Sequence, residues 1–191
     1  MQPVTIGSAA DHAFQQVRDE SVDAWVEKAI SAHAGDMDAA SCRQISQYIV
    51  ERRLRCGAEQ SGKWDAMQRR LRGRIQKGGT VTSNFQKDVC DALRTFLRLD
   101  CIEEWEEPRS RYTVDIWLPR LEIGIEVDGP YHYARGTREP LGSTLLKRRQ
   151  LRDLGMRVVT VPYWEWEETC GREEARADYL RAKIEETRQH P

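Results

Sequence analysis

The chain has 191 residues, of which 39% are hydrophobic and 32% are charged. This length suits one ordinary domain, or one domain with a helical extension, and the composition argues against an intrinsically disordered or membrane-embedded protein. No apolar run approaches the twenty or so residues that a membrane-spanning helix needs. The five cysteines are widely spaced and form no CxxC motif, so they indicate small core residues in a reducing compartment rather than disulfides or zinc ligands.

Charge is distributed unevenly along the chain, although the net charge is only −1. Residues 1–41 carry a net charge of −5, whereas residues 43–77 carry +7. This asymmetry favours a polyanionic or acidic partner for the basic segment, but a solvated helical face that pairs with the neighbouring acidic segment explains it equally well. The first twenty residues lack the apolar stretch of a targeting peptide, which leaves localisation open because a presequence could already have been removed.

Residues 1–80 are predicted to be helical with short breaks. Two apolar stripes recur near helical spacing, the first made of Ala24, Trp25, Ala29 and Ile30 and the second of Ile45, Tyr48, Ile49 and Leu54. Gly57 and the pair Ser61-Gly62 separate these helices from a third, basic helix over residues 63–77, which ends at the stop signal Gly78-Gly79. We therefore expect a helical extension over residues 1–80, acidic then basic, and a second domain over residues 81–191.

The second domain is predicted to open with a helix capped by Thr82 or Ser83. The apolar residues of this helix lie on a single face, namely Phe85, Val89, Leu93, Phe96 and Leu97. Three alternating strands follow over residues 102–106, 112–118 and 121–127, with turns at Pro108 and at Pro119-Arg120.

The last third of the chain changes from strands back to helices. A loop with Gly129-Pro130 and Gly136 leads to a helix that starts at Ser143 or Thr144 and ends at Gly155, where a left-handed cap is expected. Residues 156–162 are typical of a buried strand, and residues 172–187 of a charged amphipathic helix. The expected fold class is therefore α/β, with the order α-β-β-β-α-β-α and an all-helical amino-terminal extension.

Three acidic residues stand where two neighbouring strands can bring them together. Asp115 and Glu126 are separated by ten residues, and Asp128 follows Glu126 on the same side of its strand. Clustered carboxylates make a hard-oxygen site suited to Mg²⁺, which can activate water against a phosphodiester. Asp115, Glu126 and Asp128 are thus candidate catalytic and metal-binding residues.

These features resemble a known superfamily. The element order, the Asp-x10-Glu spacing and the string EVDG are similar to PD-(D/E)XK nucleases, including the short-patch repair endonucleases. The strings VDIWLPRLEIGIEVDGPYHY, LGSTLLKRRQLRDLGMRVVTVPYWEWEE and YLRAKI narrow the resemblance to the RAP domain, an RNA-associated module of organellar proteins. The resemblance covers about seventy residues and leaves residues 1–80 outside it. It implies a nuclease-like fold, an RNA partner and an organellar location, with the mitochondrion favoured over the plastid.

The chain departs from the nuclease pattern at two positions. Asp128 stands where the superfamily typically has the lysine that helps to activate water, and the first core helix offers Gln86 and Asp88 instead of its glutamate. The short-patch repair enzymes use a similar VDG…H arrangement without that lysine, so a Mg²⁺-dependent endonuclease stays an alternative. A structural explanation also stands, in which Glu126 pairs with Lys147 or Arg148 and Asp128 binds the turn and loop around His132. We expect a catalytically inactive domain without a cofactor.

RNA binding needs other side chains. The predicted helix after residue 143 carries a dense set of cations that suit phosphate oxygens: Lys147, Arg148, Arg149 and Arg152. Flat rings that can stack on unpaired bases flank the carboxylates: Tyr131, His132, Tyr133 and Trp164. Arg149 and Arg152 could instead pair with acids of the last helix. Tyr131 and Tyr133 are expected at the surface, and Trp166 in the core.

We therefore predict an RNA-binding protein with an inactive nuclease-like module, acting in organellar RNA metabolism or within a ribonucleoprotein such as a mitochondrial ribosome. The amino-terminal helices are expected to contact other proteins of such an assembly. A structural subunit without RNA activity of its own is the alternative.

Overall fold

The computed structural model describes residues 9–56, 61–76 and 83–189. The chain divides into two compact units, the first made of residues 1–49 and 58–78 and the second of residues 50–57 and 79–191. The predicted boundary at Gly78-Gly79 and the predicted break at Gly57 lie outside the described residues. Among the described residues, no helix combines the length and the apolar character that crossing a membrane requires.

The first unit is helical, as its periodicity predicts. Its helices are α1 (Ala9–His33), α2 (Ala39–Cys56), whose last turns belong to the second unit, and α3 (Ser61–Gln76). Val26, Ile30, Ile49, Trp64 and Leu71 are among the buried residues that form its core.

Two details of this unit differ from the sequence prediction. The first apolar stripe is only partly correct: Ile30 is in the core as predicted, but Ala24 and Trp25 are exposed, and Val26 takes the other core position. Asp23 shares the buried side of α1, where it accepts a 2.6 Å hydrogen bond from the Tyr48 hydroxyl. The buried carboxylate of Asp23 thus has a hydrogen-bond donor, as a buried polar group requires. The pair Ser61-Gly62, expected to precede the third helix, forms the first two residues of α3.

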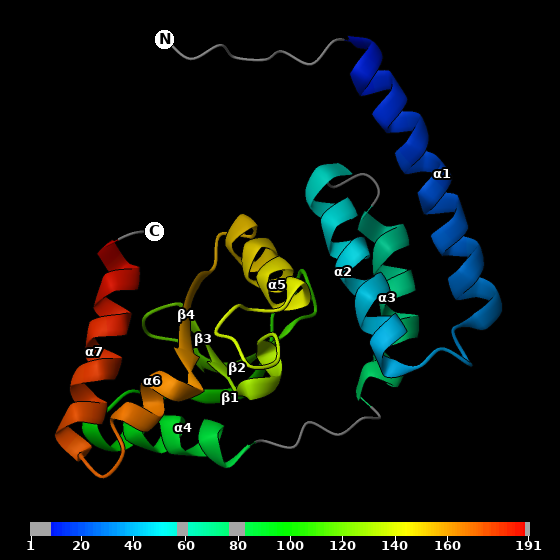
Figure 1. The fold of residues 1–191 in the computed structure, drawn as a ribbon. Helices are drawn as coiled ribbons and strands as arrows, with labels where there is room; N and C mark the ends of the chain where they lie inside the picture. Colours follow the sequence, from blue (N-terminus) through cyan, green and yellow to red (C-terminus); the bar gives the residue numbers. More distant parts are fainter. Residues whose placement is uncertain (1–8, 57–60, 77–82, 190–191) are drawn as a thin grey trace. The chain divides into compact units, whose positions relative to one another are not determined.

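The second unit is a mixed α/β domain built on one four-stranded sheet (Figure 1). In chain order its elements are α4 (Asn84–Phe96), β1 (Ile102–Glu106), β2 (Thr113–Leu118), β3 (Ile123–Asp128), the short 3₁₀ helix η2 (Pro130–His132), α5 (Gly142–Asp153), β4 (Arg157–Pro162), α6 (Tyr163–Glu168) and α7 (Glu173–Gln189). The strand order is β1-β2-β3-β4, with antiparallel pairs from β1 to β3 and a parallel pair between β3 and β4. The helix α5 is the crossover that a parallel pair requires.

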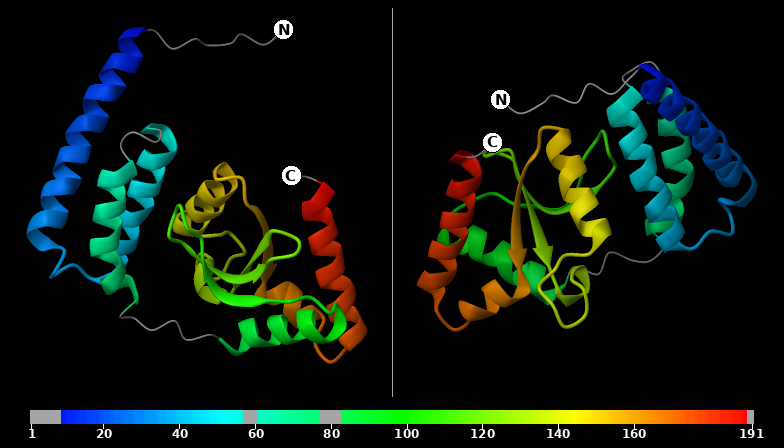
Figure 2. Two further views of the ribbon diagram at one scale, coloured as in Figure 1. Left: turned by 180° about the vertical axis from the view of Figure 1, so that it is seen from behind. Right: turned by 45° about the horizontal axis from the view of Figure 1, so that its top comes forward.

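Helices cover both faces of this sheet. On one face α4, α6 and α7 supply Val89, Leu93, Trp166, Leu180 and Ile184 to the main core. On the other face a smaller cluster joins Leu151 of α5 to Val114 and Met156. Figure 2 shows α5 on one side of the strands and α4 with α7 on the other in both views. All six residues of β3 are consequently buried, because this strand is central and covered on both sides.

Local signals in the sequence explain most element ends. Ser83 caps α4, since its hydroxyl accepts from the amide of Gln86 at 3.1 Å. Gly155 ends α5 with φ +79°, and the amide of Met156 bonds the carbonyl of Leu151 at 3.0 Å, as in a Schellman motif. The start of α5 was misplaced, since the helix begins at Gly142. The short helix α6 and the 3₁₀ helix η2 were not predicted.

Candidate nucleic-acid interface and buried acid–base network

The parallel strands β3 and β4 end side by side and bring two separate segments together. Asp128, the last residue of β3, is in register with Pro162, the last residue of β4. The loop that follows β3 and the start of α6 therefore lie next to each other. In open α/β sheets this end of the parallel strands is where ligands bind. Most of the predicted site residues lie in or near this region.

Asp115 of β2 has a structural partner. Its Oδ2 atom accepts a 2.7 Å hydrogen bond from the backbone amide of Val127 on β3. Burial raises the pKa of Asp115, while the nearby Lys147 ammonium and the Val127 amide lower it. The carboxylate thus bonds the backbone of the neighbouring strand and helps to hold the hairpin.

Glu126 forms an ion pair inside the domain. Its side chain is almost fully buried, and its Oε2 lies 2.6 Å from Nζ of Lys147. The same ammonium donates to the carbonyl of Thr113 at 2.8 Å. Burial by itself lowers the pKa of Lys147, but the carboxylates of Glu126 and Asp115 more than offset this, so the pKa lies above its usual value. Burial raises the pKa of Glu126 to about 7. This confirms the expected pairing of Glu126 with Lys147.

Asp128 is the most deeply buried of the three acids and has three partners. The Asp128 side chain is 1% exposed and forms an ion pair with the Arg148 guanidinium. Nδ1 of His132 lies 3.1 Å from Oδ1, and the Tyr133 hydroxyl donates to Oδ2 at 3.3 Å. The hydrogen bond to Asp128 raises the pKa of His132 despite burial. The expected contact of Asp128 with the loop around His132 is confirmed.

A fourth acid, Glu104 of β1, joins this region and was missed in the sequence. It lies between the paired residues Glu103 and Trp105, opposite Asp115 on β2, and has a φ of +50°. The buried Gln86 of α4 donates from Nε2 to Oε1 of Glu104 at 2.8 Å and to the backbone carbonyl of Asp115 at 3.0 Å. Burial raises the pKa of Glu104. The strand over residues 102–106 was predicted, but its register against β2 was not.

The three carboxylates that the sequence offered for Mg²⁺ have partners inside the domain. Asp115, Glu126 and Asp128 each bond a cation or a backbone amide through one oxygen. Oε1 of Glu126 and Oδ1 of Asp128 are also buried; Oε1 accepts no hydrogen bond from the described part of the chain, and Oδ1 lies beside His132. Among the residues that the structure describes, no group of three or more His, Cys, Asp or Glu side chains is arranged to hold a metal ion. A hard dication needs several oxygen ligands of that kind.

The loop after β3 presents an open surface. A pocket of about 670 Å³ is lined by Tyr131, Tyr133, Arg135, Arg138 and Tyr163, among others. The Tyr131 side chain is 92% exposed, as expected. The expectation that Tyr133 lies at the surface is wrong: Tyr133 is 6% exposed, since its hydroxyl bonds Asp128 and its ring packs inward.

Trp164 is held in place beside this pocket, whereas Trp166 belongs to the core, as predicted. The Trp164 ring lies 4.5 Å from that of Tyr133 and 5.2 Å from that of Tyr163, in edge-on geometry. The Arg138 guanidinium lies 5.2 Å from the centre of the Trp164 ring. Trp166 is 4% exposed and packs in the main core.

The cations of α5 point in different directions, so the expected single positive face is not formed. Lys147 and Arg148 turn inward to Glu126 and Asp128, with side chains 23% and 17% exposed. Arg149 and Arg152 are exposed.

Arg149 and Arg152 have other partners than the acids of the last helix, which the sequence had left open as an alternative. Within the second unit, Arg149 bonds Glu51 at 2.6 Å and lies 3.9 Å from Asp153. Nε of Arg152 donates to the carbonyl of Arg148 at 3.4 Å.

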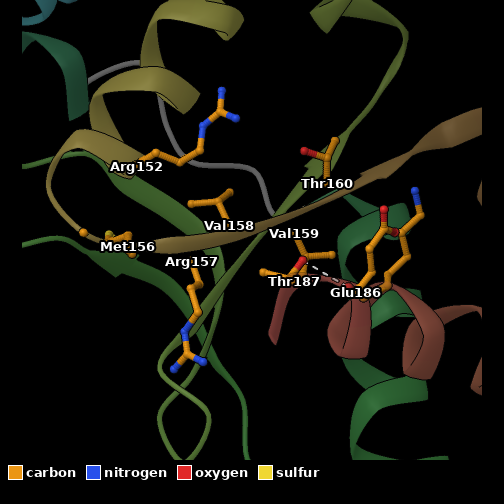
Figure 3. Close-up of a pocket in the computed structure, with 10 residues that line it drawn as sticks. Arg152, Met156, Arg157, Val158, Val159, Thr160, Glu186 and Thr187 are labelled. Carbon is orange, nitrogen blue, oxygen red and sulfur yellow. Dashed lines mark hydrogen bonds between the residues drawn. The ribbon is translucent and has the colours of Figure 1, made fainter. Parts of the chain in front are cut away.

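A second hollow lies along β4, the last strand of the sheet, between the end of α5 and α7. It has a volume of about 700 Å³ and is lined by Arg152, residues 155–160, Lys183, Glu186 and Thr187. In Figure 3, Arg152 and Arg157 extend away from β4 in opposite directions. Arg157 donates to the carbonyl of Leu121 at 2.7 Å, and Lys183 pairs with Glu165 at 2.8 Å. Most of its positive charge is therefore already engaged.

Comparison with known proteins identifies similar sequences. The RAP domain family model matches residues 125–183. Over 105 residues the chain is 37% identical to a RAP domain-containing chloroplastic protein of Oryza sativa subsp. japonica, a match that covers 53% of this chain and 15% of the relative. Over 48 residues it is 44% identical to the mitochondrial FAST kinase domain-containing protein 5 of Homo sapiens, which covers 25% of this chain and 6% of the relative. Over 73 residues it is 40% identical to the mitochondrial FAST kinase domain-containing protein 3 of Rattus norvegicus. That match covers 38% of this chain and 11% of the relative. The chain thus spans between 6% and 15% of the length of these relatives.

Proposed function

This chain carries a RAP domain at residues 125–183, and we propose that it binds RNA through this domain without cleaving it. The observation that supports binding without cleavage is that the buried carboxylates form ion pairs with cations of α5. Glu126 is neutralised by Lys147, and Asp128 by Arg148, inside the domain. A nuclease would need these carboxylates free to hold a metal ion and water. We propose that the nuclease-like pattern of acids is retained as a structural network.

The proposed RNA-binding residues divide according to burial. Tyr131, Arg149 and Arg152 are exposed, and His132 and Trp164 are partly exposed. Tyr131, His132 and Trp164 follow the carboxyl ends of β3 and β4, whereas Arg152 lines the hollow beside the start of β4. Lys147, Arg148 and Tyr133 have partners inside the domain. We therefore assign the exposed group to RNA and the inner group to the fold. We also propose that the second unit has the fold of the PD-(D/E)XK nuclease superfamily.

One assay tests binding and cleavage together. The full chain is incubated with end-labelled single-stranded and stem-loop RNA, with Mg²⁺ or with a chelator, over a range of salt concentrations. We expect binding that weakens steeply as salt rises, because phosphate contacts release counterions, and RNA that stays intact. Absence of binding at low salt would overturn the proposal. So would Mg²⁺-dependent cleavage that disappears in Asp115→Asn, a variant whose amide oxygen can still accept from Val127.

We further propose an organellar location and a role in organellar RNA metabolism. The support is that the relatives carry chloroplastic or mitochondrial names. We favour the mitochondrion, and fractionation of cells that express a tagged chain tests this. Recovery of the tagged chain outside both organelles would contradict it.

One observation favours a second role as a subunit of a ribonucleoprotein. Trp25 and Val22 lie on α1 with exposed fractions of 66% and 44%, and a large exposed ring is typical of protein contacts. We propose that these helices contact another protein of such an assembly. Trp25→Arg is expected to shift the tagged chain from a large complex to the free fraction on a gradient, while Lys28→Ala, on the same helix, leaves it in place. An unchanged profile for Trp25→Arg contradicts this role.

A further inference from the structure

The loop between β3 and α5 is a preorganised structure. Backbone bonds join Ala134 to Glu139 at 2.8 Å and Leu141 to His132 at 2.9 Å, and Tyr133 pairs with Pro140 as an isolated bridge. The loop is therefore closed on itself by its own hydrogen bonds. A ligand that binds here does not have to order the loop first, which lowers the free-energy cost of binding.

Tyr131 lines the pocket, and its ring is almost fully exposed rather than packed in the fold. It lies on η2, and Pro130 at the first position of this turn restricts the backbone. The 92% exposed ring gains almost nothing from burial. Tyr133, Tyr163 and Trp164 form a fixed aromatic group behind it, with ring centres 4.5–6.3 Å apart. The pocket thus combines one free ring with a rigid aromatic wall.

The same pocket carries positive charge. Arg135 is exposed, and within the described part of the chain it makes no hydrogen bond or ion pair. Arg138 lies over the Trp164 ring, which leaves its N–H groups available at the ring edge. Glu165, which lies near Arg138, is paired with Lys183, and Arg135 and Arg138 are the charged residues that line the pocket. A volume of about 670 Å³ is within the range of small-ligand sites.

We propose that this pocket holds one unpaired ribonucleotide, whose base stacks on Tyr131 and whose phosphates contact Arg135 and Arg138. The inference rests on the proposed RNA binding and names the place and the kind of RNA. A base can stack on a protein ring only when it is not paired in a helix, so single strands and loops bind here and regular duplexes do not. The hollow along β4 lacks such a ring, and most of its cations are engaged.

The test compares ring and charge variants of the full chain. Fluorescence anisotropy measures the Kd for a single-stranded RNA and for the corresponding duplex. Tyr131→Ala is expected to weaken single-strand binding by roughly 5- to 150-fold, whereas Tyr131→Phe, which keeps the ring, stays within about threefold of the parent chain. The affinity for the duplex should be the same in Tyr131→Ala and Tyr131→Phe. A 2-aminopurine base in the single strand should be quenched by the parent chain and by Tyr131→Phe but not by Tyr131→Ala.

A charge variant tests the phosphate contacts. Arg135→Ala with Arg138→Ala is expected to lower the slope of log Kd against log salt by about 1.4 for a single strand. Arg120→Ala is the control, because Arg120 is also exposed but lies at the turn before β3, at the other end of that strand. Thermal melts check folding, and the high exposure of Tyr131 makes loss of the fold unexpected.

The outcomes separate this inference from the proposed function. If the parent chain binds RNA and Tyr131→Ala binds single strands equally well, the pocket assignment is wrong while RNA binding stands. Equal effects of Arg120→Ala and the Arg135/Arg138 variant would also overturn it. If the parent chain binds no RNA at low salt, the proposed function itself fails.

Discussion

Replacing Asp128 with alanine should destabilise the second unit by about 3–5 kcal/mol, if the acids are a structural network. The Asp128 side chain is 1% exposed, and removing it leaves the largely buried Arg148 guanidinium without its counter-ion. Loss of one partner of a buried ion pair costs about this much because the remaining charge stays desolvated. His132 and the Tyr133 hydroxyl lose their acceptor at the same time. Since a domain of this size is stable by roughly 5–15 kcal/mol, the change is a large fraction of the total.

Urea denaturation followed by tryptophan fluorescence measures this effect, since the chain has six tryptophans. Asp178→Ala is the matched control: its exposed carboxylate pairs with Arg181 at 2.6 Å on the surface of α7, and such pairs contribute about 0–1 kcal/mol. If the acids were instead a metal site, their mutual repulsion would be relieved on removal. Unchanged or increased stability in Asp128→Ala would therefore refute the structural explanation.

Three further predictions concern the same domain. Burial raises the pKa of Glu126 from its ordinary value to about 7, so the stability that this carboxyl contributes is present at low pH and is lost as pH rises through 7. The free energy of unfolding, measured at several pH values, should therefore fall over this range relative to that of Glu126→Gln, and a constant difference between the two contradicts the assignment. A Cβ atom at Gly124 would lie 3.0 Å from Val114, so Gly124→Val should lower the free energy of unfolding in urea by about 1–3 kcal/mol. Gly142→Ala is the control, because open space surrounds Gly142 and the free energy should change little. Equal losses in the two variants would disprove the packing argument. The exposed Cys170 should react with a thiol reagent in the native protein far faster than any buried thiol, which mass spectrometry of the labelled peptides can check.

Short-range patterns in the sequence predicted the elements well where the cause was local. The Ser83 cap depends on residues three apart, and the Gly155 cap on a single left-handed residue, so both could be read without a partner. The strand over residues 102–106 was placed correctly for the same reason. The mixed α/β class and the RAP domain followed from these elements and from the strings around residues 125–183.

Contacts between residues far apart in the chain determine which side chains are buried, and the sequence alone did not predict these contacts. All four cations lie on α5, but Lys147 and Arg148 turn inward because Glu126 and Asp128 of β3 offer them counter-charges, whereas Arg149 and Arg152 stay exposed. Tyr133 is buried because Asp128 offers it an acceptor.

The sequence by itself therefore determined the kinds of element, several of their ends and the family of the domain, because these depend on neighbours within a few residues. Only the tertiary structure decided that the acids are neutralised and that the exposed ring and cations gather after β3. The physical reason is that a buried charge is stable only beside a counter-charge, and here that counter-charge comes from a helix about twenty residues further along the chain.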